Sequence, residues 1–335
     1  MKFGPVPLKE AEGAILAHSE LADGGRLRKG EILTPQHLQA LGRAGVTEVT
    51  VARLEPDDLH EDEAAALLAQ TLVQGAQGVR LSNAFTGRVN VLAEGPGVAV
   101  LDVARLDAAN DVHPMITVAT VPPYQQLGAR GMVATVKIIS YGVPKADVVR
   151  AADLARGAIG FAAPVLKTAS LIVTEIPGGA GEKGVDAIRG RAEALGLTLA
   201  EVVTVPHRAP PLAQALTGVT GDLVMILTGS ATSDSMDVAP QAVRQAGGTV
   251  DRFGMPVDPG NLLFVGGLGG RPVIGLPGCA RSPALNGADW VLSRIACGIP
   301  VTGSDIARMG VGGLLKEIPT RPMPRRGRKA TSADG

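Results

Sequence analysis

Hydrophobic positions in residues 1–80 follow helical and strand-like spacings in turn, which predicts an N-terminal α+β segment. An apolar repeat of helical spacing over residues 7–19 predicts an early helix, and turn, strand, helix and strand follow it. Thr34 before Pro35 predicts the start of the second helix, because a threonine hydroxyl caps the first N–H groups and proline fits the first turn. A further helix is expected over residues 61–74, where alanine and leucine follow an acidic first turn. We interpret this helix as a connector.

Residues 81–165 contain three runs rich in β-branched residues, each bounded by glycine or proline. The runs cover residues 84–106, 115–121 and 132–143. They predict a small β-rich domain whose sheet is antiparallel or mixed. Residues 145–155 have the spacing of a helix that leads into the next part of the chain.

Residues 166–300 repeat one pattern three times: a short apolar strand, a loop rich in glycine or small residues, and an amphipathic helix. The strands are expected at residues 169–176, 221–227 and 271–276. This order predicts an α/β domain of three αβα layers around a mostly parallel sheet, with the three loops together at the carboxyl ends of the strands. Residues 301–335 read as a C-terminal tail, and we expect its basic end, rich in proline and glycine, to be disordered.

Composition then excludes several classes of function. The 335 residues are 45% hydrophobic and carry 32 basic and 32 acidic side chains, so no overall field favours nucleic acid or an anionic membrane. Aromatic residues make up 2% of the chain, too few for platforms that stack bases. The sequence shows neither a signal peptide nor a membrane span, and its two cysteines have no zinc-ligand spacing, so we expect a cytoplasmic protein. The five histidines show no ligand spacing and are interpreted as solvent or packing residues.

The three loops have the chemistry of an anion site. Glycine lets backbone N–H groups approach a phosphate, and each following helix directs its positive dipole end toward the same place. Lys183 and Arg281 are candidates to add positive charge. Hydroxyl groups are expected from Ser230, Thr232, Ser233 and Ser235. Loops between strands and helices are also rich in Gly and Ser whatever they bind, and that alternative stays open. No loop matches a dinucleotide fingerprint, a P-loop or a nucleophile elbow.

Two segments resemble the molybdopterin-binding domain family, which includes molybdenum insertases (molybdopterin molybdotransferases) and MoaB/Mog-like proteins. LTGSATSDSMDVAP, residues 227–240, is similar to the family's TGG segment that ends in an aspartate. FGMPVDPGNLLFVGGLGGRPVIGLPGCARSP, residues 253–283, resembles its PGKP turn, strand, glycine turn and GLPGNP run. Residues 29–51 resemble the insertase segment that precedes the pterin-binding domain. The resemblance implies a molybdopterin-binding fold, molybdopterin or its adenylate as ligand, molybdate as a further substrate, and a homo-oligomer.

The resemblance also implies roles for individual residues. Asp237 falls on the family's terminal aspartate and is the candidate catalytic residue and Mg²⁺ ligand, against the alternative that it only caps the next helix. The candidate ligand-binding residues are Thr228, Gly229, Ser230, Thr232, Ser233, Ser235, Gly275, Pro277, Gly278, Arg281, Ser282 and Lys183. Residues 275–278 are expected to form a sharp turn, and Ser282 to cap the helix after it. Two alternatives stay open for Cys279: a helix N-terminus beside it lowers the pKa of its thiol and makes it reactive, or it has no such role, as is usual for loop cysteines.

Three departures from the family pattern bear on the reaction. Ser230 replaces the second glycine of TGG, Asn261 stands where the family has lysine, and Cys279-Ala280 replaces Asn-Pro. The leading hypothesis is a transferase that helps insert molybdate during molybdenum cofactor biosynthesis. Asn261 favours a second hypothesis, a non-catalytic carrier or scaffold that hands the cofactor to another protein. A nucleotide-binding α/β domain is the third.

Overall fold

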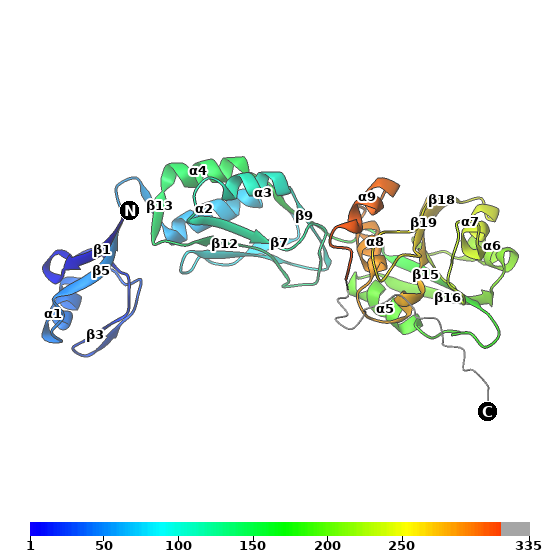
Figure 1. The fold of residues 1–335 in the computed structure, drawn as a ribbon, viewed down its shortest axis with the longest axis horizontal. Helices are drawn as coiled ribbons and strands as arrows, with labels where there is room; N and C mark the ends of the chain where they lie inside the picture. The colour runs from blue at the N-terminus through cyan, green and yellow to red at the C-terminus, as the bar shows by residue number, and fades with distance from the viewer. Residues whose placement is uncertain (316–335) are drawn as a thin grey trace, which may run out of the picture. The chain divides into compact units, whose positions relative to one another are not determined.

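The computed structural model describes residues 1–315, and the expected disorder at the end of the tail lies outside these residues. The chain divides into two compact units, Met1–Val165 and Leu166–Gly335 (Figure 1). Each unit has hydrophobic clusters of its own.

The N-terminal part of unit 1 is a small α+β structure around the buried strand β5 (Glu48–Arg53). The other elements are β1 (Lys2–Pro7), β2 (Ile15–Leu16), β3 (Glu20–Ala22), β4 (Gly25–Leu27) and helix α1 (Pro35–Arg43). Strands β1 and β2 pair with β5 on either side, both antiparallel. The predicted start of α1 is confirmed, because Thr34 and His37 form a capping box with Pro35 in the first turn.

The helix predicted over residues 7–19 is wrong. A single 3-10 turn, Leu8–Glu10, is followed by Gly13 in the left-handed region at φ +71°, and Gly13 N–H donates to the Leu33 carbonyl. The chain then enters strand β2, which buries both of its side chains against β5. Pairing with a neighbouring strand therefore outweighs the local helical spacing.

The rest of unit 1 packs three helices on one face of an antiparallel sheet of order β10-β12-β8-β7 (Figure 1). The helices are α2 (Glu61–Leu72), α3 (Val103–Asn110) and α4 (Lys145–Leu154), and the strands are β7 (Val79–Leu81), β8 (Arg88–Ala93), β10 (Ile116–Thr120) and β12 (Met132–Ile138). Shorter sheets join β9 (Gly97–Leu101), β11 (Gln126–Leu127) and β14 (Ile159–Ala162), and pair β6 (Asp58–His60) with β13 (Gly142–Pro144). The predicted antiparallel β structure and the helices near 61–74 and 145–155 are confirmed.

Helix α2 is not a connector, as the sequence suggested, but the centre of this core. Ala64, Ala65, Leu68, Ala69 and Leu72 are all fully buried in it. Alanines at helical spacing let a sheet approach the helix closely. The alanine-rich composition that suggested a connector therefore serves packing.

Unit 2 is a mixed α/β structure around a six-stranded sheet of order β16-β15-β17-β20-β19-β18. The strands are β15 (Thr168–Glu175), β16 (Thr198–Pro206), β17 (Leu223–Leu227), β18 (Thr249–Phe253), β19 (Phe264–Leu268) and β20 (Arg271–Leu276). The first four strands in spatial order are parallel to one another. Strand β19 is antiparallel to β20, and β18 is antiparallel to β19. The α/β class and the three predicted strands are confirmed.

Helices lie on both sides of this sheet (Figure 1). Helices α5 (Val185–Ala194) and α8 (Gly287–Ala296) pack in one hydrophobic cluster with the short α9 (Gly303–Ala307), and α6 (Ala209–Gly218) and α7 (Val238–Gln245) pack in another. Leu223, Met225 and Leu227 of β17 join the first cluster, whereas Val224 and Ile226 join the second. A strand covered on both faces is hydrophobic at every position, as β17 is.

The segment interpreted as a tail begins inside the folded unit. Ile306 and Met309 are buried in the cluster that contains α8, and Leu315 N–H donates to the Asp258 carbonyl. Residues 301–315 therefore belong to the folded part of unit 2, and Ile306 and Met309 contribute to its core.

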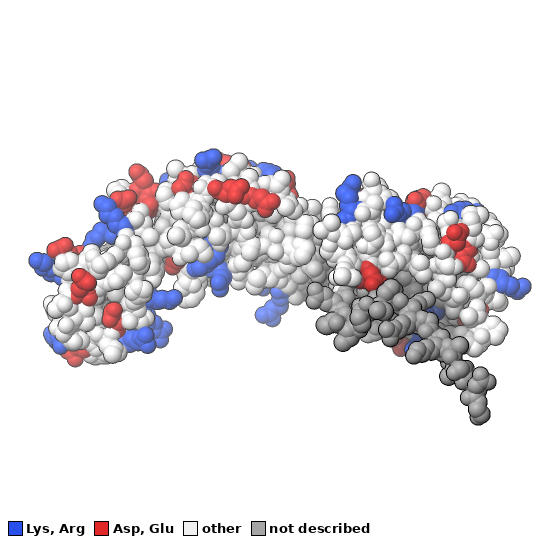
Figure 2. All heavy atoms as spheres, viewed as in Figure 1, with Lys and Arg blue, Asp and Glu red and all other residues white. Residues whose placement is uncertain are grey.

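No helix within residues 1–315 is both long and apolar enough to cross a membrane. On the face shown in Figure 2, the basic and acidic side chains of these residues are interspersed.

Candidate functional site

Arg281 joins the loops that follow β15, β17 and β20. Its Nη1 donates to the carbonyls of Gly181, at 3.0 Å, and Lys183, and its Nη2 donates to the Thr228 carbonyl at 2.9 Å. The predicted convergence of three loops at one sheet edge is therefore confirmed. Burial lowers the pKa of Arg281. Sequence reasoning assigned this guanidinium to a phosphate, but two of its nitrogens hold the loops together.

Asp237 lies at the start of α7 and bonds to its own loop. Its Oδ1 accepts from Val238 N at 2.7 Å, and its Oδ2 accepts from Ser233 N at 2.9 Å and from the Ser233 hydroxyl at 3.3 Å. Partial burial by itself would raise the pKa of Asp237, but these hydrogen bonds and the nearby His207 outweigh it and lower the pKa. The carboxylate is therefore ionised at neutral pH and caps the helix, as the structural alternative expected.

Thr174, near the carboxyl end of β15, connects two further segments at this edge. Its fully buried hydroxyl accepts from Gly229 N at 2.9 Å and lies 2.8 Å from Nδ1 of His207, which follows β16. An added Cβ at Gly229 would lie 2.6 Å from the Thr174 carbonyl, so the family-like glycine is required for this close approach. Sequence reasoning missed His207, because neither β16 nor α6 was among the predicted elements.

The predicted turn over residues 275–278 is placed differently. Gly275 and Leu276 belong to β20, and an added Cβ at Gly275 would lie 1.9 Å from the ring of Phe264. Gly275 therefore makes room for an aromatic ring inside the sheet. Pro277 and Gly278 begin a 3-10 turn that ends at Arg281.

Ser282 does not cap α8, contrary to the sequence prediction. The N-cap is Asn286, which forms a capping box with Asp289, and α8 begins at Gly287. The Ser282 hydroxyl instead accepts from Ala284 N at 3.2 Å within the preceding loop. The N-cap is four residues further along than expected because the chain bends at Ser282, Pro283 and Ala284 before the helix begins.

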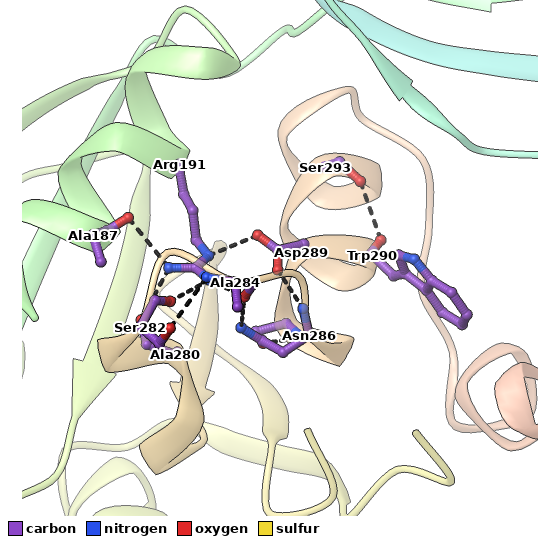
Figure 3. A network of polar contacts seen from close by, with 10 residues as sticks. Ala187, Arg191, Ala280, Ser282, Ala284, Asn286, Asp289, Trp290 and Ser293 are labelled. Carbon is purple, nitrogen blue, oxygen red and sulfur yellow. Dashed lines mark hydrogen bonds and ion pairs between the residues drawn. The ribbon is translucent and has the colours of Figure 1, made fainter. Parts of the chain in front are cut away.

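Arg191 of α5 holds this third loop through its guanidinium (Figure 3). Its guanidinium forms an ion pair with Asp289, Nε to Oδ1, at 2.6 Å, and it donates to four backbone carbonyls. The carbonyls belong to Ala187, Ala280, Ser282 and Ala284. Arg191 is buried, and a buried charge with this many acceptors fixes loop geometry. In the sequence, Arg191 is one residue of a predicted helix, and nothing in the sequence indicated that it holds this loop.

Of the two alternatives for Cys279, the structure favours the unreactive thiol. The dominant effect is burial, which raises the pKa of its thiol; Arg191 opposes it but is outweighed. The group is therefore a protonated thiol at neutral pH and a poor nucleophile.

The remaining candidates differ in accessibility. Ser230, Ser233 and Lys183 are exposed, Ser235 is half-buried and Thr232 is buried. A hollow of about 320 Å³ opens at the carboxyl ends of β15 and β16, and none of these candidates lines it. Its lining is Glu175, Ile176, Pro177, Thr204, Val205 and Pro206.

A protein-built magnesium site does not fit these residues. Within the described chain, His, Cys, Asp and Glu side chains form no group of three or more that could hold a metal ion. Both oxygens of Asp237 already accept hydrogen bonds from the protein. Magnesium requires near-octahedral oxygen ligands, so Asp237 alone does not supply such a site.

Comparison with known proteins identifies one short family match. Residues 5–53 match a domain of unknown function (DUF8806). No curated protein matches the chain. Among solved structures, the chain is similar to the molybdopterin biosynthesis MoeA protein from Pyrococcus horikoshii, with 12% identity and a TM-score of 0.28 over 92% of this chain and 77% of the other.

Two further structures show similarity at the same level. A molybdenum cofactor biosynthesis protein from Pyrococcus furiosus has 14% identity and a TM-score of 0.23 over 84% of this chain and 59% of its own. The molybdopterin biosynthesis enzyme MoaB from Thermus thermophilus has 17% identity and a TM-score of 0.26 over 45% of this chain and 100% of its own. At TM-scores this low, the similarities carry no argument about this chain.

Proposed function

We propose that residues 166–300 form a molybdopterin-binding domain whose sheet edge binds molybdopterin or its adenylate. The observation that carries the proposal is the meeting of three loops at that edge, two of which lie in the segments that resemble the family. Arg281 ties the loop of Thr228 to the loop of Gly181 and Lys183. A phosphate at this edge meets backbone N–H groups and the exposed hydroxyls of Ser230 and Ser233.

The proposed reaction is molybdotransferase-like: the chain holds the pterin while molybdate, a substrate, is inserted into it. Asp237 is ionised and only accepts hydrogen bonds, so its role is to orient groups of the ligand that carry protons. No step through magnesium is assigned, because the described residues do not build its site.

Reconstitution tests this reaction. Full-length protein, molybdopterin or its adenylate, and molybdate are combined, and the product is measured by activation of an apo-molybdoenzyme. The proposed transferase gives more product than the Asp237→Asn variant, which retains a side-chain oxygen for the helix cap. Equal activation by the two proteins would remove Asp237 from the reaction.

A non-catalytic carrier is the second candidate, and one observation favours it. Asn261 stands where the resemblance expects lysine, and the carboxylate of Asp237 is already committed to Ser233 and Val238. A carrier binds molybdopterin tightly and gives no product in the reconstitution. Binding of nucleotide without molybdopterin would instead select the third hypothesis, a nucleotide-binding domain.

A further inference from the structure

His207 lies at the sheet edge without a role in the function proposed above. It follows β16, and its backbone N–H donates to the Glu175 carbonyl at 2.8 Å, which fixes the residue beside the end of β15. Its ring is partly buried, with Nδ1 2.8 Å from the hydroxyl of Thr174.

The hydrogen bonds of the Thr174 hydroxyl indicate which ring nitrogen of His207, Nδ1 or Nε2, carries the proton. A hydroxyl has one proton to donate, and the Thr174 oxygen already accepts from Gly229 N at 2.9 Å. Thr174 is fully buried, so an unused hydroxyl proton there carries a desolvation cost. The hydroxyl proton is satisfied when it is donated to Nδ1 of His207. Neutral His207 then has its own proton on Nε2.

The second ring nitrogen is therefore presented as a donor. Within residues 1–315, no hydrogen bond involves Nε2 of His207. The ring also lies near the loop after β17, because the Thr174 hydroxyl beside Nδ1 accepts from Gly229 N of that loop. A rigid N–H donor at a site formed by strand ends suits an anionic oxygen.

We infer that His207 is a ligand-binding residue of this site, and that Thr174 positions its ring so that Nε2–H donates to a phosphate oxygen of the ligand. The inference rests on the proposed function only for the identity of the ligand. Any phosphate monoester presents the same acceptor to His207. Thr174 is the positioning residue, acting through His207.

The tautomer is measured directly by long-range ¹H–¹⁵N spectra of protein labelled at histidine, with His207 assigned by substitution. Neutral His207 is expected to be protonated at Nε2. Thr174→Val, which removes the hydroxyl and keeps the shape, is expected to give a mixture of tautomers, and Thr174→Ser to restore the Nε2–H form. A wild-type His207 protonated at Nδ1 would overturn the inference, as would an unchanged tautomer in Thr174→Val.

Two amide substitutions separate ligand binding from local structure. The amide nitrogen of glutamine reaches the place of Nε2, whereas that of asparagine reaches the place of Nδ1. His207→Gln is therefore expected to keep an affinity for molybdopterin within a few-fold of wild type, and His207→Asn to weaken it about 10-fold. A purely structural His207 gives the reverse order, and that result would overturn the inference.

Inorganic phosphate is the second probe, with the His207 ¹⁵N shifts as the readout. A shift on addition of phosphate, in a protein that binds no molybdopterin, supports the inference and removes the proposed function. Molybdopterin binding that leaves the His207 shifts and the affinity of His207→Asn unchanged supports the proposed function and overturns the inference. If neither probe binds, both are wrong.

Discussion

Gly184 packs directly against Arg281: a Cβ added at Gly184 would lie 2.6 Å from Cα of Arg281 and 2.7 Å from its Cβ. The backbone of Gly184 is also in the left-handed region, at φ +100°. Both conditions require glycine, so the loop after β15 and the loop after β20 meet only because residue 184 has no side chain.

Gly184→Ala is expected to lower the free energy of unfolding by about 2 kcal/mol, from backbone strain and the clash together. Urea unfolding measures it. Gly178→Ala is the matched control, because Gly178 has a positive φ of +71° with nothing within 4 Å of the added Cβ. The difference between the two variants isolates the contact with Arg281. Equal losses would mean that this contact contributes nothing.

Arg281→Ala removes the donors to the carbonyls of Gly181, Lys183 and Thr228. We expect a loss of about 2–3 kcal/mol in stability and weaker molybdopterin binding, because three carbonyls lose a charged donor and the loops separate. Arg281→Lys is expected to recover little, since one ammonium group does not reproduce the planar guanidinium. Full recovery by lysine, in urea unfolding and in titration, would show that charge alone matters.

Arg191→Met is expected to destabilise unit 2 by about 3–5 kcal/mol, because it leaves Asp289 without its buried partner and frees four carbonyls. Arg189→Met is the control: the same change, two residues earlier on α5 and outside this network. Urea unfolding of the two variants makes the comparison. Similar losses would contradict the role given to Arg191.

The expected pH dependence of Asp237 follows from its lowered pKa. An acid whose pKa is lower in the folded state stabilises the protein above its unfolded pKa, about 3.9, and loses that contribution as the pH falls through the folded value. The unfolding free energies of wild type and Asp237→Asn should therefore converge once the pH falls below the folded-state pKa of Asp237. Asp237→Ala should cost about 1 kcal/mol at pH 7, as loss of a cap does. Curves that stay parallel down to low pH would contradict this assignment.

Cys279 is expected to react slowly with iodoacetamide at pH 7 and faster as the pH rises, because burial raises the pKa of its thiol. The measurement uses a Cys297→Ala background, so that Cys279 is the one thiol present. Urea-unfolded protein gives the reference rate. A folded-state rate at pH 7 above that reference would indicate an activated thiolate instead.

The sequence predicted the elements whose signals are local. Helix α1 has its cap in four adjacent residues, and β17 is apolar at every position, so both were placed correctly. Strand β16 was missed because it is a sheet edge whose burial follows no clean alternation. The early helix failed because pairing with β5 is a long-range contact that overrides local spacing.

The same difference between local and long-range signals applies to the residues of the candidate site. Asp237 and the loop of Thr228 and Gly229 were found because their residues are adjacent in the chain. Thr174 and His207 are 33 residues apart, and Arg191 contacts carbonyls up to 93 positions away, so their roles exist only in the folded chain. Arg281 lies where the three loops meet, as expected, but its hydrogen bonds to backbone carbonyls were not visible in the sequence.

The central claim is that the sheet edge of unit 2 binds molybdopterin. The most direct test is to purify the full-length protein from a host that makes molybdopterin, oxidise it, and measure the fluorescent pterin product per chain, with Gly184→Ala as the variant in which the loops no longer meet. The account predicts pterin bound to the wild-type protein and much less bound to Gly184→Ala. Wild-type protein that carries no pterin, and that binds none when molybdopterin is added, would contradict it.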